Sequence, residues 1–147
     1  MENIVVHGIL TNTSNKVSEE YKSEVPTKCA YIYAASKKDA DRMVSFGLTE
    51  YTPKDGGAGF FAVRMSKTVS VYHSDNKDGT PDEKIDCRVT DNDGNKTPNF
   101  KCRDGITVAM NLVKGEKMKN SFIRLQAFLC DDIDTVFEEI KPINPFI

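Results

Sequence analysis

Three segments in which apolar and polar residues alternate constrain the fold of this chain most strongly. They cover residues 60–72, 106–112 and 122–129. Successive side chains of a β-strand point to opposite faces, so strict alternation predicts half-buried strands rather than helices. In the last segment we expect Leu125 and Leu129 to lie on the face that packs into the core.

Two further segments, residues 4–13 and 28–35, are rich in β-branched and aromatic residues and are also predicted to be strands. A helix is expected directly after the second. Ser36 is placed to cap its first turn, Asp39 follows three residues later, and Gly47 is placed to end it.

A shorter strand is expected at residues 85–90, and the apolar spacing of residues 132–140 predicts a short C-terminal helix. The 147 residues suffice for one domain with a sizeable core. Five or six strands with one inserted helix therefore predict an all-β fold with minor α content. A closed or nearly closed five-stranded barrel is favoured, because closure removes exposed strand edges.

The residues that enzymes and metal sites need are scarce. The two histidines, His7 and His73, lie in no catalytic or metal-binding motif. The four cysteines include no C-x-x-C pair and match no common zinc spacing, so we expect buried, reduced thiols. The sequence thus predicts a protein that is not an enzyme and needs no cofactor or metal.

No apolar run approaches the roughly 18–20 residues of a membrane-spanning helix, and the first residues do not resemble a secretory signal. We therefore expect a cytoplasmic protein with no membrane partner. The residues leave the oligomeric state open.

The formal net charge of −2 hides an uneven distribution. Residues 131–147 hold five acids against Lys141, a net charge of −4, which leaves +2 for residues 1–130. We therefore divide the chain into a mildly basic domain and an acidic C-terminal segment. Such asymmetry is typical of interaction tails, although a solvated face with an amphipathic helix is the alternative.

Basic and aromatic residues alternate on the strand faces expected to point outward. Because Phe61, Val63 and Met65 are expected to fill the interior, Phe60 and Arg64 should face solvent. Aromatic rings stack on bases and cations track phosphates in proteins that bind single strands. The residues predicted to stack are Tyr33, Phe60, Tyr72 and Phe122. The cations predicted to neutralise phosphates are Arg64, Lys101, Arg103 and Arg124, with Lys117 in a basic loop, Lys114–Lys119, that would close over the strand.

Three stretches resemble the single-stranded DNA-binding proteins of tailed bacteriophages. They are VVHGILTN at residues 5–12, CAYIYAASKKDADRM at residues 29–43, and the long stretch from Val89 to Ile133. The last is similar to that family's paired ending, a turn with Asp and Gly, then G-x-x-I-x-V-x-x-x-L, a variable basic loop and a final strand.

This resemblance implies an OB-fold in residues 1–130 and sequence-independent binding of single-stranded DNA in replication or recombination. It also implies that an acidic end recruits replication or recombination proteins. Phe137 and Phe146 are the candidate partner-binding residues of the acidic segment. The alternative function is a phage or host-interaction module that binds a protein partner through this segment.

Overall fold

The computed structural model describes residues 2–14, 27–103, 105–115, 122–131 and 133–136. For Asn12, Phe122 and residues 133–136 it describes the backbone alone. The described elements, in chain order, are β1 (Glu2–Ser14), β2 (Cys29–Ala34), α1 (Lys37–Phe46), β3 (Glu50–Tyr51), β4 (Phe60–Tyr72), β5 (Glu83–Asp86), β6 (Asn99–Cys102), β7 (Val108–Gly115), β8 (Phe122–Leu129) and β9 (Ile133–Val136).

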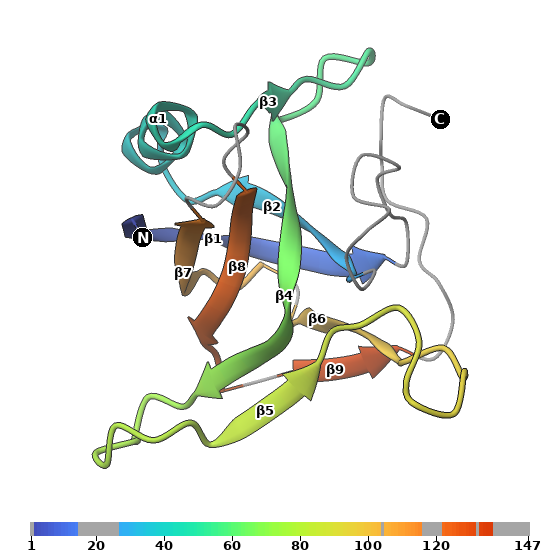
Figure 1. Cartoon of the computed structure of the whole chain (residues 1–147). Coiled ribbons are helices and arrows are strands. Elements are labelled where there is room, and N and C mark those ends of the chain that lie inside the picture. The colour runs from blue at the N-terminus through green and yellow to red at the C-terminus, as the bar shows by residue number, and fades with distance from the viewer. Residues whose placement is uncertain (1, 15–26, 104, 116–121, 132, 137–147) are drawn as a thin grey trace.

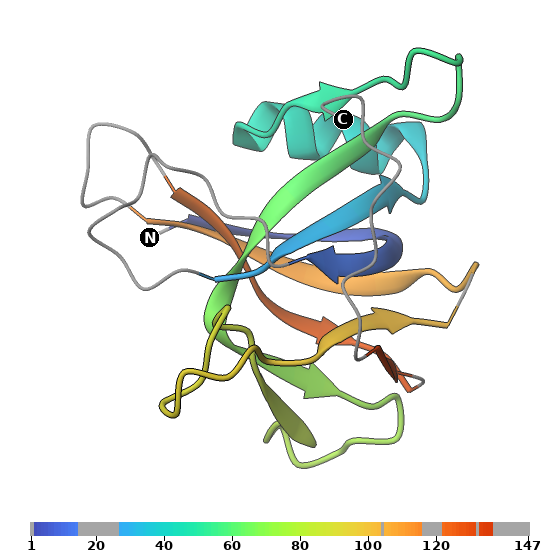
Figure 2. The ribbon, with the colours of Figure 1, turned by 90° about the vertical axis from the view of Figure 1, so that its right-hand side faces the viewer.

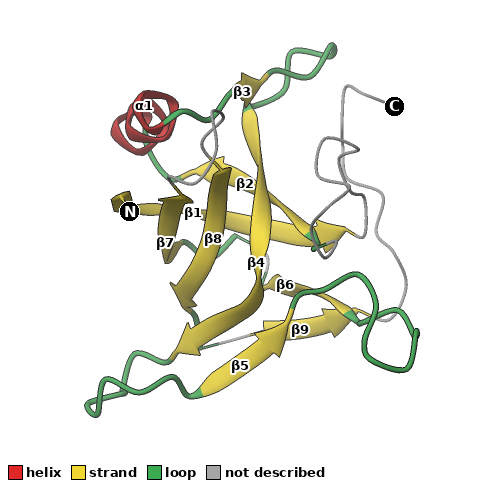
Figure 3. Ribbon diagram, in the orientation of Figure 1, coloured by secondary structure: helices red, strands yellow, loops and turns green. Residues whose placement is uncertain are grey.

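Five of these strands close into a barrel (Figures 1 and 3). Around the barrel the order is β1, β2, β4, β8, β7 and back to β1. The pairing of β4 with β8 is parallel, whereas the other four pairings are antiparallel. An OB-fold-like all-β class, as predicted, is confirmed.

The alternating apolar residues fill the barrel as the sequence predicts. Phe61, Val63 and Met65 of β4 are at most 1% exposed and belong to one core cluster. In β1, Gly8 lies where the backbone of β2 approaches closely. A Cβ atom there would stand 2.7 Å from the carbonyl oxygen of Tyr33, so a larger residue would force the strands apart.

The predicted helix is also confirmed. The Ser36 hydroxyl accepts a hydrogen bond from the Asp39 amide, and the Asp39 carboxylate accepts bonds from that hydroxyl and from the His7 amide of β1. Gly47 ends the helix with a φ of 122°, which side chains with a Cβ rarely adopt. Met43 and Phe46 are buried in the core cluster, so α1 covers one end of the barrel (Figure 2).

The prediction that Leu129 fills the barrel is wrong, because β8 contains a β-bulge. Asn111 pairs with Ala127 but the next residue, Leu112, pairs with Leu125, so Gln126 is an extra residue in β8. An extra residue moves every later side chain to the opposite face. Leu129 is consequently 42% exposed, while Phe128 is 2% exposed in the core.

The predicted C-terminal helix is wrong where the structure describes it. Ile133–Val136 is strand β9, which pairs antiparallel with β6 in a separate two-stranded sheet. These residues are β-branched at three of four positions, so they favour a strand when a partner strand is available. A helix this short would be marginal without such packing.

A buried lysine connects the barrel to the segment that leads into β6. Lys28, which is 0% exposed, donates from Nζ to the Thr97 carbonyl oxygen and to Asn99 Oδ1, each at 2.9 Å. Asn99 Oδ1 also accepts a hydrogen bond from the Thr13 hydroxyl at the end of β1. Hydrogen bonds from a charged group are among the stronger ones, so this contact fixes where β6 lies.

Within the described part of the chain, no helix is long and apolar enough to cross a membrane.

Candidate nucleic-acid interface

Two arginines predicted to contact phosphate lie side by side on the outer surface of the barrel. The parallel pairing of β4 and β8 places Arg64 in register with Arg124, and the pairing of β4 with β2 places Cys29 on the other side of Arg64. Neighbouring strands are about 4.8 Å apart. All three side chains are partly exposed, and their sequence neighbours Val63 and Leu125 point into the core. We call Cys29, Arg64 and Arg124 the arginine row.

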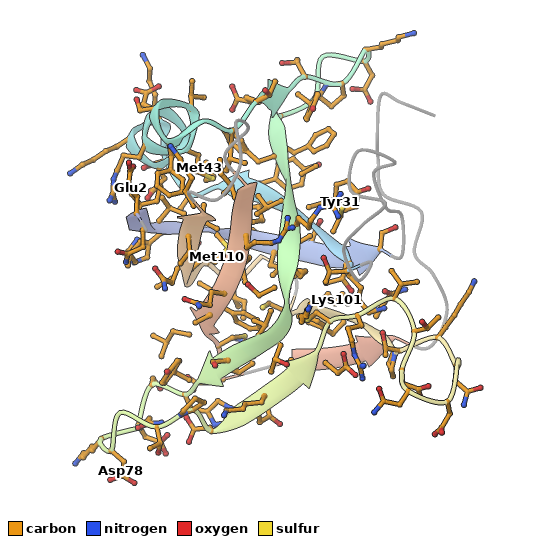
Figure 4. All side chains as sticks on the ribbon, in the orientation of Figure 1. Glu2, Tyr31, Met43, Asp78, Lys101 and Met110 are labelled. Carbon is orange, nitrogen blue, oxygen red and sulfur yellow. The ribbon has the colours of Figure 1, made fainter. Side chains whose placement is uncertain are left out.

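Four aromatic rings gather further along the same outward face. The Phe60 ring of β4 lies at the centre, with ring centroids 6.2 Å from Tyr31, 6.3 Å from Tyr33 and 5.9 Å from Tyr51. We call these four residues the aromatic cluster. Since Tyr31 pairs with Ala62 and Cys29 pairs with Arg64, the cluster begins two residues along these strands from the arginine row. Figure 4 labels Tyr31 beside β4.

Exposure differs among the rings of this cluster. Phe60 is 1% exposed and Tyr31 is 4% exposed, whereas Tyr33 and Tyr51 are partly exposed. Phe60 therefore lies outside the barrel core, as predicted, but beneath the tyrosines, where its ring is not accessible to a base. Tyr33 is the predicted stacking residue whose ring remains partly accessible.

Tyr51 was not predicted from the sequence. It belongs to β3, a strand of two residues, which is too short to show any alternation. The Gly-rich connector that follows returns the chain to Phe60, and Tyr51 pairs directly with it. The one available signal was an aromatic residue next to that connector.

Tyr72, another predicted stacking residue, lies at the opposite end of β4. It is in register with Leu129 of β8, and both line a shallow recess of about 520 Å³ together with Val5. Val5 and Leu129 are 46% and 42% exposed, so this recess has an apolar part, which His73, Ser74 and Asn76 border. The structure does not bring Tyr72 together with the aromatic cluster.

Lys101 and Arg103 lie in β6 and directly after it, so they belong to the two-stranded sheet rather than to the barrel wall. Lys101 is in register with Asp134 of β9. Phe100, which precedes Lys101 in β6, is 2% exposed and stacks on Phe128 with centroids 6.0 Å apart. Its role is packing.

Several predicted residues lie outside what the structure describes. Lys117, Phe137 and Phe146 belong to undescribed segments, and Phe122 is described by its backbone alone. The roles of Lys117 and Phe122 in DNA binding, and of Phe137 and Phe146 in partner binding, therefore stay predictions.

The carboxylates with shifted pKa values lie away from this face. The Ser36 hydroxyl, followed by the His7 amide, lowers the pKa of Asp39, and the Arg88 guanidinium lowers that of Asp86. Burial raises the pKa of the Cys87 thiol to about 12.

Among the described residues, no three His, Cys, Asp or Glu side chains are grouped closely enough to hold a metal ion. What the arginine row and aromatic cluster offer is positive charge and ring surface.

Comparison with protein-family models, curated proteins and solved structures found no match to this chain.

Proposed function

We propose that this protein binds single-stranded DNA, without strong sequence preference, on the outward face of β2, β4 and β8. The observation that carries the proposal is the in-register placement of Arg64 and Arg124, two residues along the strands from the aromatic cluster. Both arginines were expected to contact phosphate from the sequence pattern alone.

The in-register pairing brings the positive charges of Arg64 and Arg124 to neighbouring positions on one face of the barrel. Guanidinium groups bind phosphate oxygens with paired hydrogen bonds, so a phosphate of a nucleic-acid backbone fits the chemistry of this row.

The aromatic cluster supports a single strand as the ligand rather than a duplex. Bases of a single strand are unstacked and can lie on aromatic rings, and stacking of this kind tolerates any base. Tyr33 and Tyr51 offer partly exposed rings above the buried Phe60. A strand whose phosphates follow the arginine row would place its bases toward these tyrosines.

Fluorescence anisotropy with labelled oligo-dT tests the proposal. We expect binding that weakens steeply as salt is raised, because each neutralised phosphate releases counterions. A duplex of the same length should bind more weakly. Absence of binding to oligo-dT at low ionic strength contradicts the proposal.

A matched pair of variants tests the site. Arg64→Ala combined with Arg124→Ala removes two positive charges from the arginine row, and Lys37→Ala combined with Lys38→Ala removes two from the exposed face of α1. We expect the first pair to lower affinity by about 10-fold or more and to flatten the salt dependence, and the second to change affinity by less than about 2-fold. Equal losses would indicate attraction by overall charge and no defined site.

The phage origin, the role in replication or recombination and the cytoplasmic location rest on the resemblance described above and stay predictions. The same holds for recruitment of a protein partner by the acidic C-terminal segment.

A further inference from the structure

A second surface, bounded by β5 and the segment that leads into β6, forms a cleft of about 610 Å³. All four residues of β5 line one wall, and Thr97, Pro98 and Phe100 line the other. His73 and Asp131 also line it. Figures 1 and 2 both show β5 at the end of the molecule opposite α1.

Strand β5, which lines this cleft with all four of its residues, is paired along one edge only among the described strands. One edge pairs with β4 over Thr68–Val71, and among the described strands β5 has no second partner. The backbone N–H and C=O groups of an unpaired edge can pair with another chain, which is how many domains bind extended peptides. The edge is short, four residues or about 13 Å at the usual rise per residue.

The opposite wall of the cleft is fixed by hydrogen bonds and ring stacking, so the cleft is preformed. The Thr97 carbonyl oxygen accepts the hydrogen bond from buried Lys28, and the Thr97 hydroxyl donates to the Arg88 carbonyl oxygen. Phe100 is fixed by its stacking on Phe128. Binding at such a wall requires little rearrangement, which lowers its entropic cost.

The charge around the cleft is negative. Residues 73–86 hold five acids against two lysines. Within the cleft, the Asp86 carboxylate is neutralised by Arg88 at 2.6 Å, whereas the Glu83 side chain is 56% exposed and has His73 at 3.9 Å. Asp131 accepts hydrogen bonds from the amide and hydroxyl of Ser74 and remains exposed. Glu83 and Asp131 can therefore attract a cationic group.

We propose that this cleft binds an extended, basic segment of a partner protein, which adds to the open edge of β5 as a further strand. Lysine or arginine side chains of the segment face Glu83 and Asp131, and an apolar side chain packs toward Phe100 and Ile85. The negative charge around the cleft disfavours binding of nucleic acid there. The proposal for this cleft therefore does not rest on the proposed DNA-binding function.

Nuclear magnetic resonance with the full-length protein and synthetic heptapeptides tests this proposal. The first heptapeptide alternates lysine and valine and is blocked at both ends. The second replaces each lysine by glutamate, and the third keeps the lysines but replaces each valine by proline, which removes backbone donors while keeping the charge. We expect the first to shift and protect the amides of residues 83–86 and to bind at least about 10-fold more tightly than the other two.

Two variants provide a matched comparison. The exposed Glu83 lies 3.9 Å from His73, and the exposed Glu2 lies 3.9 Å from Lys114. We expect Glu83→Lys to weaken binding of the lysine–valine peptide about 5-fold or more, and Glu2→Lys to leave it unchanged. Their amide spectra show directly whether each variant is folded.

Three results overturn the proposal. Equal binding of the proline peptide would show attraction by charge without strand addition. Shifts confined to residues outside the cleft would place the peptide elsewhere. Concentration-dependent shifts of residues 83–86 without peptide, together with a dimer in sedimentation, would assign the edge to a second copy of this chain.

Discussion

Strand β4 contributes to two surfaces of opposite charge. Its first half, Phe61–Arg64, pairs with β2 and carries Arg64 of the arginine row, whereas Thr68–Val71 pairs with β5 in the acidic hairpin region. Figure 4 shows the two ends well apart, with Tyr31 labelled beside the first half and Asp78 at the tip of the β4–β5 hairpin.

The contrast between these two surfaces explains why the net charge of the chain says little about its function. The strand changes partner between Arg64 and Thr68, where exposed Lys67 interrupts the apolar alternation. One half of a strand thus joins a basic surface and the other an acidic one. Interactions between exposed charges are screened beyond about 10 Å in 0.1 M salt, so each surface acts through its own local charge.

Charge reversal should separate the two surfaces most clearly. We expect Arg64→Glu with Arg124→Glu to lower oligo-dT affinity by about 100-fold, because repulsion of phosphate replaces two charge-assisted hydrogen bonds. Asp82→Lys with Glu83→Lys should change it by less than about 3-fold. Anisotropy titrations at fixed salt measure both affinities. Similar changes in the two variants would show that the two surfaces do not differ in their effect on DNA binding.

Loss of one accessible ring should have the next largest effect. We expect Tyr33→Ala to weaken oligo-dT binding about 10-fold, since stacking of one base on an aromatic side chain contributes about 1–3 kcal/mol. Tyr72→Ala, at the other end of β4, should weaken it less than about 3-fold. If Tyr72→Ala costs as much as Tyr33→Ala, the DNA extends to the apolar recess and the proposed face is too small.

Thiol alkylation should report which surface is occupied. Cys29 is partly exposed in the arginine row, while Cys87, Cys102 and Cys130 are buried and none of the four forms a disulfide. We expect oligo-dT to slow maleimide labelling at least about 5-fold, and the lysine–valine heptapeptide to leave the rate unchanged. Labelling is followed by mass spectrometry, with Cys29→Ser as the control that should not react. An unchanged rate with saturating oligo-dT would place the DNA away from the row.

Lowering the pH should destabilise the β4–β5 hairpin before it destabilises the barrel. Hydrogen bonds from Asn76 and His73 lower the pKa of Asp82, and those from Ser74 lower the pKa of Asp131, below the ordinary 3.8. A lowered pKa stabilises the folded state above pH 3.8, and that contribution is lost as the pH falls through the folded-state pKa.

Amide hydrogen exchange measures this loss. The His73 and Ser74 amides donate to the two carboxylates, so their exchange should accelerate modestly, about 2- to 3-fold after correction for intrinsic rates, between pH 5 and pH 3. The Met65 amide, which donates to the Lys28 carbonyl oxygen in the barrel, serves as the control. Equal acceleration of Met65 would indicate global unfolding.

Local sequence patterns predicted much of the fold because their causes are local. Alternation identified three of the barrel strands, and β-branched and aromatic content identified the other two. Ser36, Asp39 and Gly47 identified helix α1 and its ends. The same patterns failed where a distant strand decided the outcome. The bulge at Gln126 depends on how β8 pairs with β7, and β9 depends on a partner strand more than 30 residues earlier in the chain.

The candidate site was also predicted from the sequence only in part. Arg64, Arg124 and Tyr33 were predicted to face outward, because the face of a strand follows from its period of two. Their register was not predictable, since β4 and β8 are parallel and about 60 residues apart in sequence. Tyr51 was missed because its strand is too short for a pattern.

Propensity and periodicity act over a few residues, so they were enough to predict a β-barrel with one capped helix and the strand faces that are basic and aromatic. They did not predict that two arginines lie in register beside an aromatic cluster, that Phe60 is covered, or that β5, paired along one edge only among the described strands, lines an acidic cleft. These depend on strand register and on contacts between segments far apart in the chain, which no local pattern contains.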